Sequence, residues 1–130
     1  MKVDISEYQR MLHEGKLELI LKGLPGAKGI AIGYVRVGPT FKSIRDSMQR
    51  GDVVVVPLTY PPDVPYLVKN ECSAIVTDRG GITTHAVLFS QSRNIPCVPG
   101  TGNATKVLEN YDGKILVDGN AGRVYKVKEG

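Results

Sequence analysis

Apolar residues near the start of the chain recur every three or four positions, which is the spacing of one face of a helix. The stripe consists of Ile5, Tyr8, Leu12 and Leu19. A Gly-Leu-Pro-Gly run at residues 23–26 then stops the pattern. We therefore expect a helix over residues 5–22, so that residues 1–22 form an N-terminal helix or linker and residues 23–130 form the domain.

The rest of the chain alternates short β-strands with short helices. The four valines at residues 53–56 are typical of a strand that is buried on both faces, because they show no polar alternation. The expected strands lie at 30–37, 52–57, 73–77, 96–98, 114–117 and 123–127, the last two as a hairpin. The expected helices lie at 41–49, 64–70, 83–92 and 103–109. This order predicts a single α/β domain with an N-terminal helical appendage.

Composition and charge exclude several classes of protein. Apolar residues make up 42% of the chain and charged residues 23%, which is ordinary for a globular domain. The net charge is +4, but no basic stripe is interleaved with aromatic residues, so we expect no nucleic-acid partner. The apolar runs are too short to span a bilayer, and no apolar leader follows Met1. We therefore expect a cytoplasmic protein that has no contact with membranes.

The two cysteines give no sign of a metal site. Cys72 and Cys97 lie far apart and match no zinc-binding spacing. We expect two reduced, partly buried thiols rather than a disulfide.

A glycine-rich turn leads into a predicted helix at His85. Gly80 and Gly81 permit a tight turn and let a ligand approach the backbone closely. Either Thr83 or Thr84 can cap the helix that follows. On either choice His85 falls in the first turn of that helix.

This position favours chemistry with phosphate. The first N–H groups of a helix lack internal partners and carry partial positive charge, so a phosphate gains hydrogen bonds there. The same dipole disfavours imidazolium, and a neutral imidazole is a nucleophile towards phosphorus. The hydroxyls of Thr83 and Thr84, together with Arg79, can stabilise the added charge. A structural histidine, or a turn that only caps a helix, remains an alternative, and neither GxxxxGK[ST] nor GxGxxG is present.

The segment from Gly80 to Ala86 resembles the Gly-Gly-x-Thr-x-His-Ala signature of the mobile phosphohistidine domain in phosphoenolpyruvate-utilising enzymes. That family includes phosphoenolpyruvate synthase, pyruvate phosphate dikinase and enzyme I of the sugar phosphotransferase system. Further segments resemble the family in the expected order: residues 23–33, 51–55, 74–79, 95–96, 100–105, 112–113 and 117–125. The resemblance covers roughly residues 23–127.

The resemblance implies a swivelling β/β/α sandwich in which His85 is phosphorylated on Nε2. It implies that Thr83 helps to hold the ring or the phosphate, and that Gly80 and Gly81 form the loop that the phosphoryl group approaches. A second phosphate-binding loop would lie nearby, formed by Gly100, Thr101, Gly102 and Asn103. The chain departs from the family pattern at Lys28, Tyr60, Pro62, Gln91 and Pro99. Tyr60 and Pro62 replace the acidic positions of the family's Thr-Asp-Pro-Asp turn.

The length of 130 residues leaves no room for the ATP-binding domain and the phosphoenolpyruvate-binding barrel of such enzymes. The resemblance therefore implies nucleotide-binding and phosphoenolpyruvate- or pyruvate-binding partners, as separate domains or subunits. We expect Mg²⁺ and ATP or phosphoenolpyruvate on those partners, and no cofactor on this chain. A phosphoryl carrier is the first hypothesis. A non-catalytic binding or regulatory module with the same fold is the second, suggested by Tyr60, Pro62 and Gln91.

Overall fold

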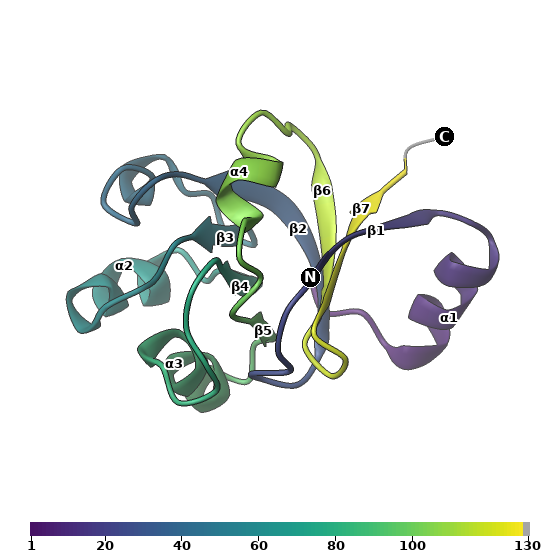
Figure 1. The fold of residues 1–130 in the computed structure, drawn as a ribbon, viewed down its shortest axis with the longest axis horizontal. Helices are drawn as coiled ribbons and strands as arrows, with labels where there is room; N and C mark the ends of the chain where they lie inside the picture. Colours follow the sequence, from purple (N-terminus) through teal and green to yellow (C-terminus); the bar gives the residue numbers. More distant parts are fainter. Residues whose placement is uncertain (129–130) are drawn as a thin grey trace.

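The computed structural model describes residues 1–128, which form a seven-stranded sheet with helices on two sides (Figure 1). The strands are β1 Leu17–Lys22, β2 Ile30–Val37, β3 Val53–Val56, β4 Ala74–Thr77, β5 Cys97–Val98, β6 Lys114–Asp118 and β7 Arg123–Val127. The helices are α1 Ile5–His13, α2 Val64–Lys69, α3 His85–Arg93 and α4 Ala104–Leu108, with 3-10 turns η1 Arg45–Ser47 and η2 Pro61–Asp63. The strand order is β1-β7-β6-β2-β3-β4-β5.

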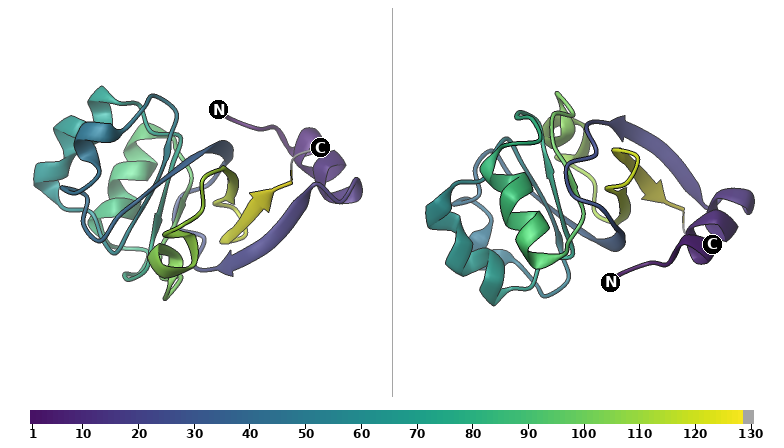
Figure 2. Two further views of the ribbon diagram at one scale, coloured as in Figure 1. Left: turned by 90° about the horizontal axis from the view of Figure 1, so that it is seen from above. Right: turned by 90° about the horizontal axis from the view of Figure 1, so that it is seen from below.

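Strand β2 joins an antiparallel half of the sheet to a parallel half. Its residues 30–34 pair antiparallel with β6, and its residues 35–37 pair parallel with β3. The two halves pack against each other through a shared apolar cluster. Views from above and below show α2 and α3 outside the parallel strands and α1 outside the antiparallel strands (Figure 2). The predicted β/β/α sandwich is confirmed.

The valines of β3 show how the parallel strands are buried on both faces. Val53 and Val55 pack into the cluster between the two halves of the sheet, whereas Val54 and Val56 pack beneath α2 and α3. Successive side chains of a strand point to opposite faces, and here both faces are covered. The strand that the unbroken apolar run predicts is therefore confirmed.

The helix predicted over residues 5–22 is wrong beyond His13. Asp4 is the N-cap residue of α1, and its carboxylate accepts the Glu7 N–H at 2.8 Å. Gly15 has a φ of +70°, a left-handed conformation that ends the helix, and residues 17–22 instead form strand β1 beside β7. The apolar residues of β1 happen to lie at the spacing of the helical stripe of α1, which is why the sequence predicts one long helix. The sheet therefore begins before residue 23.

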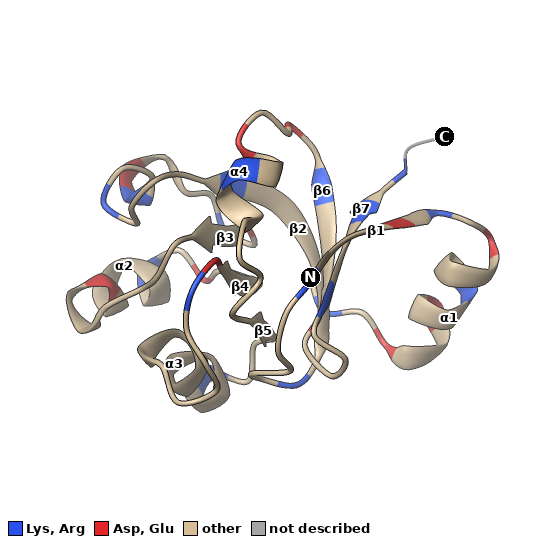
Figure 3. Ribbon diagram, viewed as in Figure 1, with Lys and Arg blue, Asp and Glu red and all other residues tan. Residues whose placement is uncertain are grey.

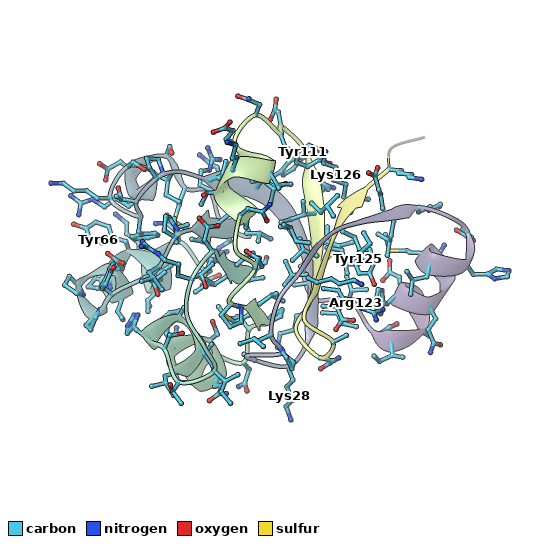
Figure 4. All side chains as sticks on the ribbon, in the orientation of Figure 1. Lys28, Tyr66, Tyr111, Arg123, Tyr125 and Lys126 are labelled. Carbon is cyan, nitrogen blue, oxygen red and sulfur yellow. The ribbon has the colours of Figure 1, made fainter. Side chains whose placement is uncertain are left out.

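Helix α1 remains as an N-terminal helix outside the two sheet halves. Its buried face carries Tyr8 and Met11. The Tyr8 hydroxyl donates to the Tyr125 hydroxyl at 2.8 Å, and Figure 4 shows Tyr125 between the strands and α1. This buried contact holds the helix on the antiparallel strands.

The helix predicted over residues 41–49 is also wrong, because only turns and η1 form there. The Ser43 hydroxyl donates to the Thr40 carbonyl at 2.6 Å, and the Ser43 N–H donates to the Thr40 hydroxyl at 3.2 Å. Such local side-chain bonds compete with helix formation. The remaining predicted strands and helices are found within a few residues of their expected bounds.

No helix within residues 1–128 is both long and apolar enough to cross a membrane. Cys72 and Cys97 are free thiols and are more deeply buried than expected. Within the same residues, no three His, Cys, Asp or Glu side chains are grouped as metal ligands would be. Lys and Arg are distributed along the fold, on strands, helices and loops (Figure 3).

Candidate functional site

His85 is the first residue of α3, at the end of the sheet where the parallel strands finish. The loop after β4 leads to Thr84, which has the extended conformation of an N-cap residue. The segments after β3 and β5 reach the same edge of the sheet. In open α/β sheets this carboxyl-terminal edge is where ligands bind.

The N–H groups at the start of α3 are open. The first N–H bonded within the helix is that of Leu88, which donates to the Thr84 carbonyl at 3.1 Å. The N–H groups of His85, Ala86 and Val87 have no hydrogen-bond partner within residues 1–128, and no side chain caps the helix. Such a helix start favours an anion through both hydrogen bonds and the helix dipole.

The His85 ring is held on one side only. Its Nδ1 lies 3.0 Å from Oγ1 of Thr59, a residue that is 3% exposed. The ring of Phe89, one turn along α3, stacks on the imidazole with centroids 6.3 Å apart. Nε2 has no hydrogen-bond partner within the described residues, and the side chain is half-buried. This arrangement fixes the ring and leaves Nε2 available.

Thr59 is the site residue that the sequence analysis missed. It follows β3 and is 26 residues away from His85 in the chain, so no local pattern joins the two. The available signal is the resemblance of residues 59–62 to the family's Thr-Asp-Pro-Asp turn, in which Thr59 matches the threonine.

Gly80 and Gly100 shape the loop before α3. Gly80 has a φ of +106°, and a Cβ added there would lie 2.7 Å from Cγ2 of Thr84. Gly100 has a φ of +68°, and a Cβ there would lie 2.9 Å from the Gly80 carbonyl oxygen. Both positions therefore require glycine. A Cβ on Gly81 would meet nothing within 4 Å, so the space beside that residue is open.

The second predicted loop is tied to the first by hydrogen bonds. Thr101 donates to the Thr77 carbonyl through its N–H at 3.2 Å and its hydroxyl at 3.0 Å, and the Gly102 N–H donates to the Asp78 carbonyl at 2.8 Å. The Asp78 carboxylate accepts both the N–H and the hydroxyl of Thr105, at 2.8 and 2.6 Å. Asp78 thus joins the two loops, and its carboxylate makes no hydrogen bond to His85.

The other predicted residues take different places. The Thr84 hydroxyl donates to the Gly81 carbonyl at 2.9 Å, so it stabilises the turn. Thr83 and Arg79 are exposed, and their side chains make no hydrogen bond or ion pair within residues 1–128. Asn103 precedes α4 without a side-chain cap and is exposed. The structure thus gathers Gly80, Thr84 and Gly100 around the start of α3, and the roles of the other residues stay predictions.

One departure from the family pattern has a hydrogen-bond partner in the structure, and another is exposed. The Gln91 side chain donates to the Gly26 carbonyl at 2.9 Å and so ties α3 to the segment before β2. Lys28 points away from the protein (Figure 4). Both residues line a hollow of about 770 Å³ towards the carboxyl end of α3, and His85 does not line it.

Comparison with known proteins identifies the family. The family described as "PEP-utilising enzyme, mobile domain" matches residues 48–122, which include the loop before α3 and His85. The phosphoenolpyruvate synthase of Aeropyrum pernix is 44% identical over 109 residues, which are 83% of this chain and 13% of that enzyme. The probable phosphoenolpyruvate synthase of Methanothermobacter thermautotrophicus is 41% identical over 109 residues, 84% of this chain and 15% of that protein.

A solved structure shows the same fold. The solution structure of an Enzyme I protein (nEIt) superposes with a TM-score of 0.51 and 31% sequence identity. The match covers 62% of this chain and 32% of the Enzyme I chain. The chain described here spans only a small part of each relative. It belongs to the family of mobile domains of phosphoenolpyruvate-utilising enzymes.

Proposed function

We propose that this chain carries a phosphoryl group on Nε2 of His85 and passes it between the active sites of partner domains or subunits. The observation that supports this most directly is the hydrogen-bonding of the ring. The Thr59 hydroxyl is hydrogen-bonded to Nδ1, while Nε2 has no partner within the described residues and lies at a helix start whose N–H groups are open.

The hydrogen bond to Thr59 selects the reactive nitrogen. If Nδ1–H donates to the Thr59 hydroxyl oxygen, the lone pair of the neutral ring lies on Nε2. This pair attacks the phosphorus of a donor, the donor P–O bond breaks, and the leaving oxygen keeps the bonding electrons. In the second transfer an acceptor oxygen attacks the same phosphorus and the N–P electrons return to Nε2. Nδ1 keeps its proton through both steps.

The surroundings of His85 favour the phosphorylated state. The open N–H groups at the start of α3 can receive the phosphoryl oxygens, and the helix dipole favours their charge. Arg79 is an exposed cation two residues from β4, and it can pair with a phosphate. The open space at Gly81 leaves room for an approaching group. Thr83 is exposed in the same turn and adds a hydroxyl.

Partner proteins would supply the substrates. The chain spans 13 to 15% of its synthase relatives, and the hollow at the other end of α3 does not include His85. We therefore assign Mg²⁺ and ATP or phosphoenolpyruvate, together with the acceptor pyruvate, to partner sites. The cytoplasmic location expected from the sequence stays a prediction.

A transfer experiment tests the proposal. The donor is the Aeropyrum pernix synthase without the segment that matches this chain, hereafter the truncated synthase, supplied with Mg²⁺ and ATP or phosphoenolpyruvate. Adding back the enzyme's own segment establishes that the truncated synthase is competent. We expect one acid-labile phosphate on this chain by intact mass, none on His85→Ala, and full labelling of His13→Ala. The proposal would be contradicted if the truncated synthase phosphorylated its own added segment but not the wild-type chain. Phosphorylation of the His85→Ala chain would also contradict it.

The non-catalytic alternative loses part of its motivation. Gln91 has a structural partner in Gly26, so its presence needs no change of function. Tyr60 and Pro62 lie in the turn that positions Thr59, and the threonine is retained. A partner complex with equal affinity and equal effect in His85→Ala would favour the binding module.

A further inference from the structure

Large apolar side chains are exposed on the segments that meet at His85. Ile82 is 57% exposed in the turn before α3, and Leu88 is 56% exposed one turn beyond His85 on that helix. Tyr60 is 55% exposed and follows Thr59, whose hydroxyl contacts the ring. Exposed apolar residues are ordinary when scattered, but these three come from neighbouring segments around one nucleophile.

A fourth apolar residue continues this surface. Leu24 is 41% exposed, and its N–H donates to the Pro99 carbonyl at 2.9 Å. Its side chain lies against Gly100, which in turn lies against the Gly80 carbonyl. We call Leu24, Tyr60, Ile82 and Leu88 the apolar rim of His85.

The carboxylates beside the rim accept hydrogen bonds from the protein, whereas the side chain of the one arginine there makes none within the described residues. The Asp78 carboxylate is occupied by Thr105, and the Asp63 carboxylate accepts the Tyr60 N–H at 2.8 Å. Arg79 is exposed and has no ion-pair partner within residues 1–128. The surface therefore offers apolar contact and a free cation, and it complements an apolar surface that holds an anionic group.

We propose that the apolar rim is the docking surface for the mouth of a partner active site that holds the phosphoryl donor. The inference rests on the proposed function and adds the residues that make the contact. The occupant is a protein cleft with an apolar lip and a bound phosphate, because His85 must reach the phosphorus and Arg79 matches its charge. Burial of the rim on docking also excludes water from the N–P bond during transfer.

The test compares rim variants with a matched surface variant. Ile82→Gln/Leu88→Gln removes two anchors and introduces no charge near the ring. Ile5→Gln replaces an apolar residue that is 54% exposed on α1, on the other side of the sheet (Figure 1). Each chain is titrated against the truncated synthase to find the half-saturating concentration in transfer. Equilibrium binding is measured in parallel with the same substitutions in the His85→Ala chain.

We expect the rim variant to raise the half-saturating concentration in transfer and the equilibrium Kd by about tenfold or more. This is the usual loss of affinity when interface anchors are removed. Ile5→Gln should leave both unchanged. Chemical phosphorylation of His85 by phosphoramidate should proceed at the wild-type rate in the rim variant and in Ile5→Gln, both with His85 present, which shows that the nucleophile is intact. Binding of wild type and rim variant with equal affinity, or no binding of the wild-type chain, would overturn the docking surface. Rim-dependent binding without phosphoryl transfer would instead overturn the proposed function and leave the docking surface standing.

Discussion

The hydroxyl oxygen of Thr59 lies 3.0 Å from Nδ1 of His85 and ties the turn after β3 to the start of α3. Thr59 is buried, so the ring is fixed from the protein side and faces outwards through Nε2. The hydrogen bond is thus both a positional restraint and, in the proposed mechanism, the feature that selects one ring nitrogen.

Removing this hydroxyl should slow phosphorylation of His85. Thr59→Val keeps the shape of the side chain but leaves Nδ1 without its partner, so the ring loses its orientation. We expect the transfer rate to fall about tenfold or more, as for other residues that hold a catalytic imidazole. Thr59→Ser restores a hydroxyl and should recover most of the rate. The measurement is single-turnover labelling by the truncated synthase, and equal rates for Val and Ser would contradict the role of the hydroxyl.

The two adjacent glycines of the loop should differ in their response to alanine. Gly80→Ala forces a Cβ into a left-handed conformation and against Thr84, and it should lower the free energy of unfolding by about 1–3 kcal/mol. Gly81→Ala meets open space and should change the free energy by less than about 0.5 kcal/mol. Urea unfolding followed by circular dichroism compares the two. Equal destabilisation would mean that the loop has another conformation.

The contact between Asp78 and Thr105 should contribute to stability. Asp78→Ala removes two hydrogen bonds to a carboxylate and leaves the Thr105 N–H unpaired, which should cost about 2–3 kcal/mol. Thr105→Val removes only the hydroxyl bond and should cost less. The free energies of unfolding of the two variants give the comparison, and a neutral Asp78→Ala would show that the loops are held by other contacts.

The two cysteines should be unreactive in the folded protein. Burial raises the pKa of the Cys72 and Cys97 thiols to about 12 from an ordinary value of 9.0. The unfolded chain therefore releases protons first as pH rises above 9.0, and the free energy of unfolding should fall between that value and about 12.

Thiol titration with a coloured disulfide reagent checks this at about pH 8, where thiolate is the reacting form. We expect two thiols to react rapidly in denaturant and neither to react rapidly in its absence. Rapid reaction of the native protein would show that the cysteines are accessible.

The sequence predicts the parts of the fold that depend on local pattern. The buried run of β3 and the helix that starts near His85 follow from periodicity and turn residues. The N-terminal segment is predicted wrongly because the alternating apolar residues of β1 continue the helical stripe of α1. Only the pairing of residues 17–22 with β7 distinguishes a strand from a longer helix there. At the site, the signature around His85 is sufficient to identify it as the proposed nucleophile. Thr59 was missed because the sheet order, rather than the sequence, brings it to the ring.

Nitrogen NMR of the two histidine rings tests the central claim most directly. The chain contains only His13 and His85, and a His13→Gln variant assigns the signals. With ¹⁵N-labelled histidine, we predict that the resting His85 ring carries its proton on Nδ1 and that, after transfer, phosphorus couples to Nε2 of the same ring. A resting proton on Nε2, or phosphorus coupled to Nδ1 or to His13, would contradict the account.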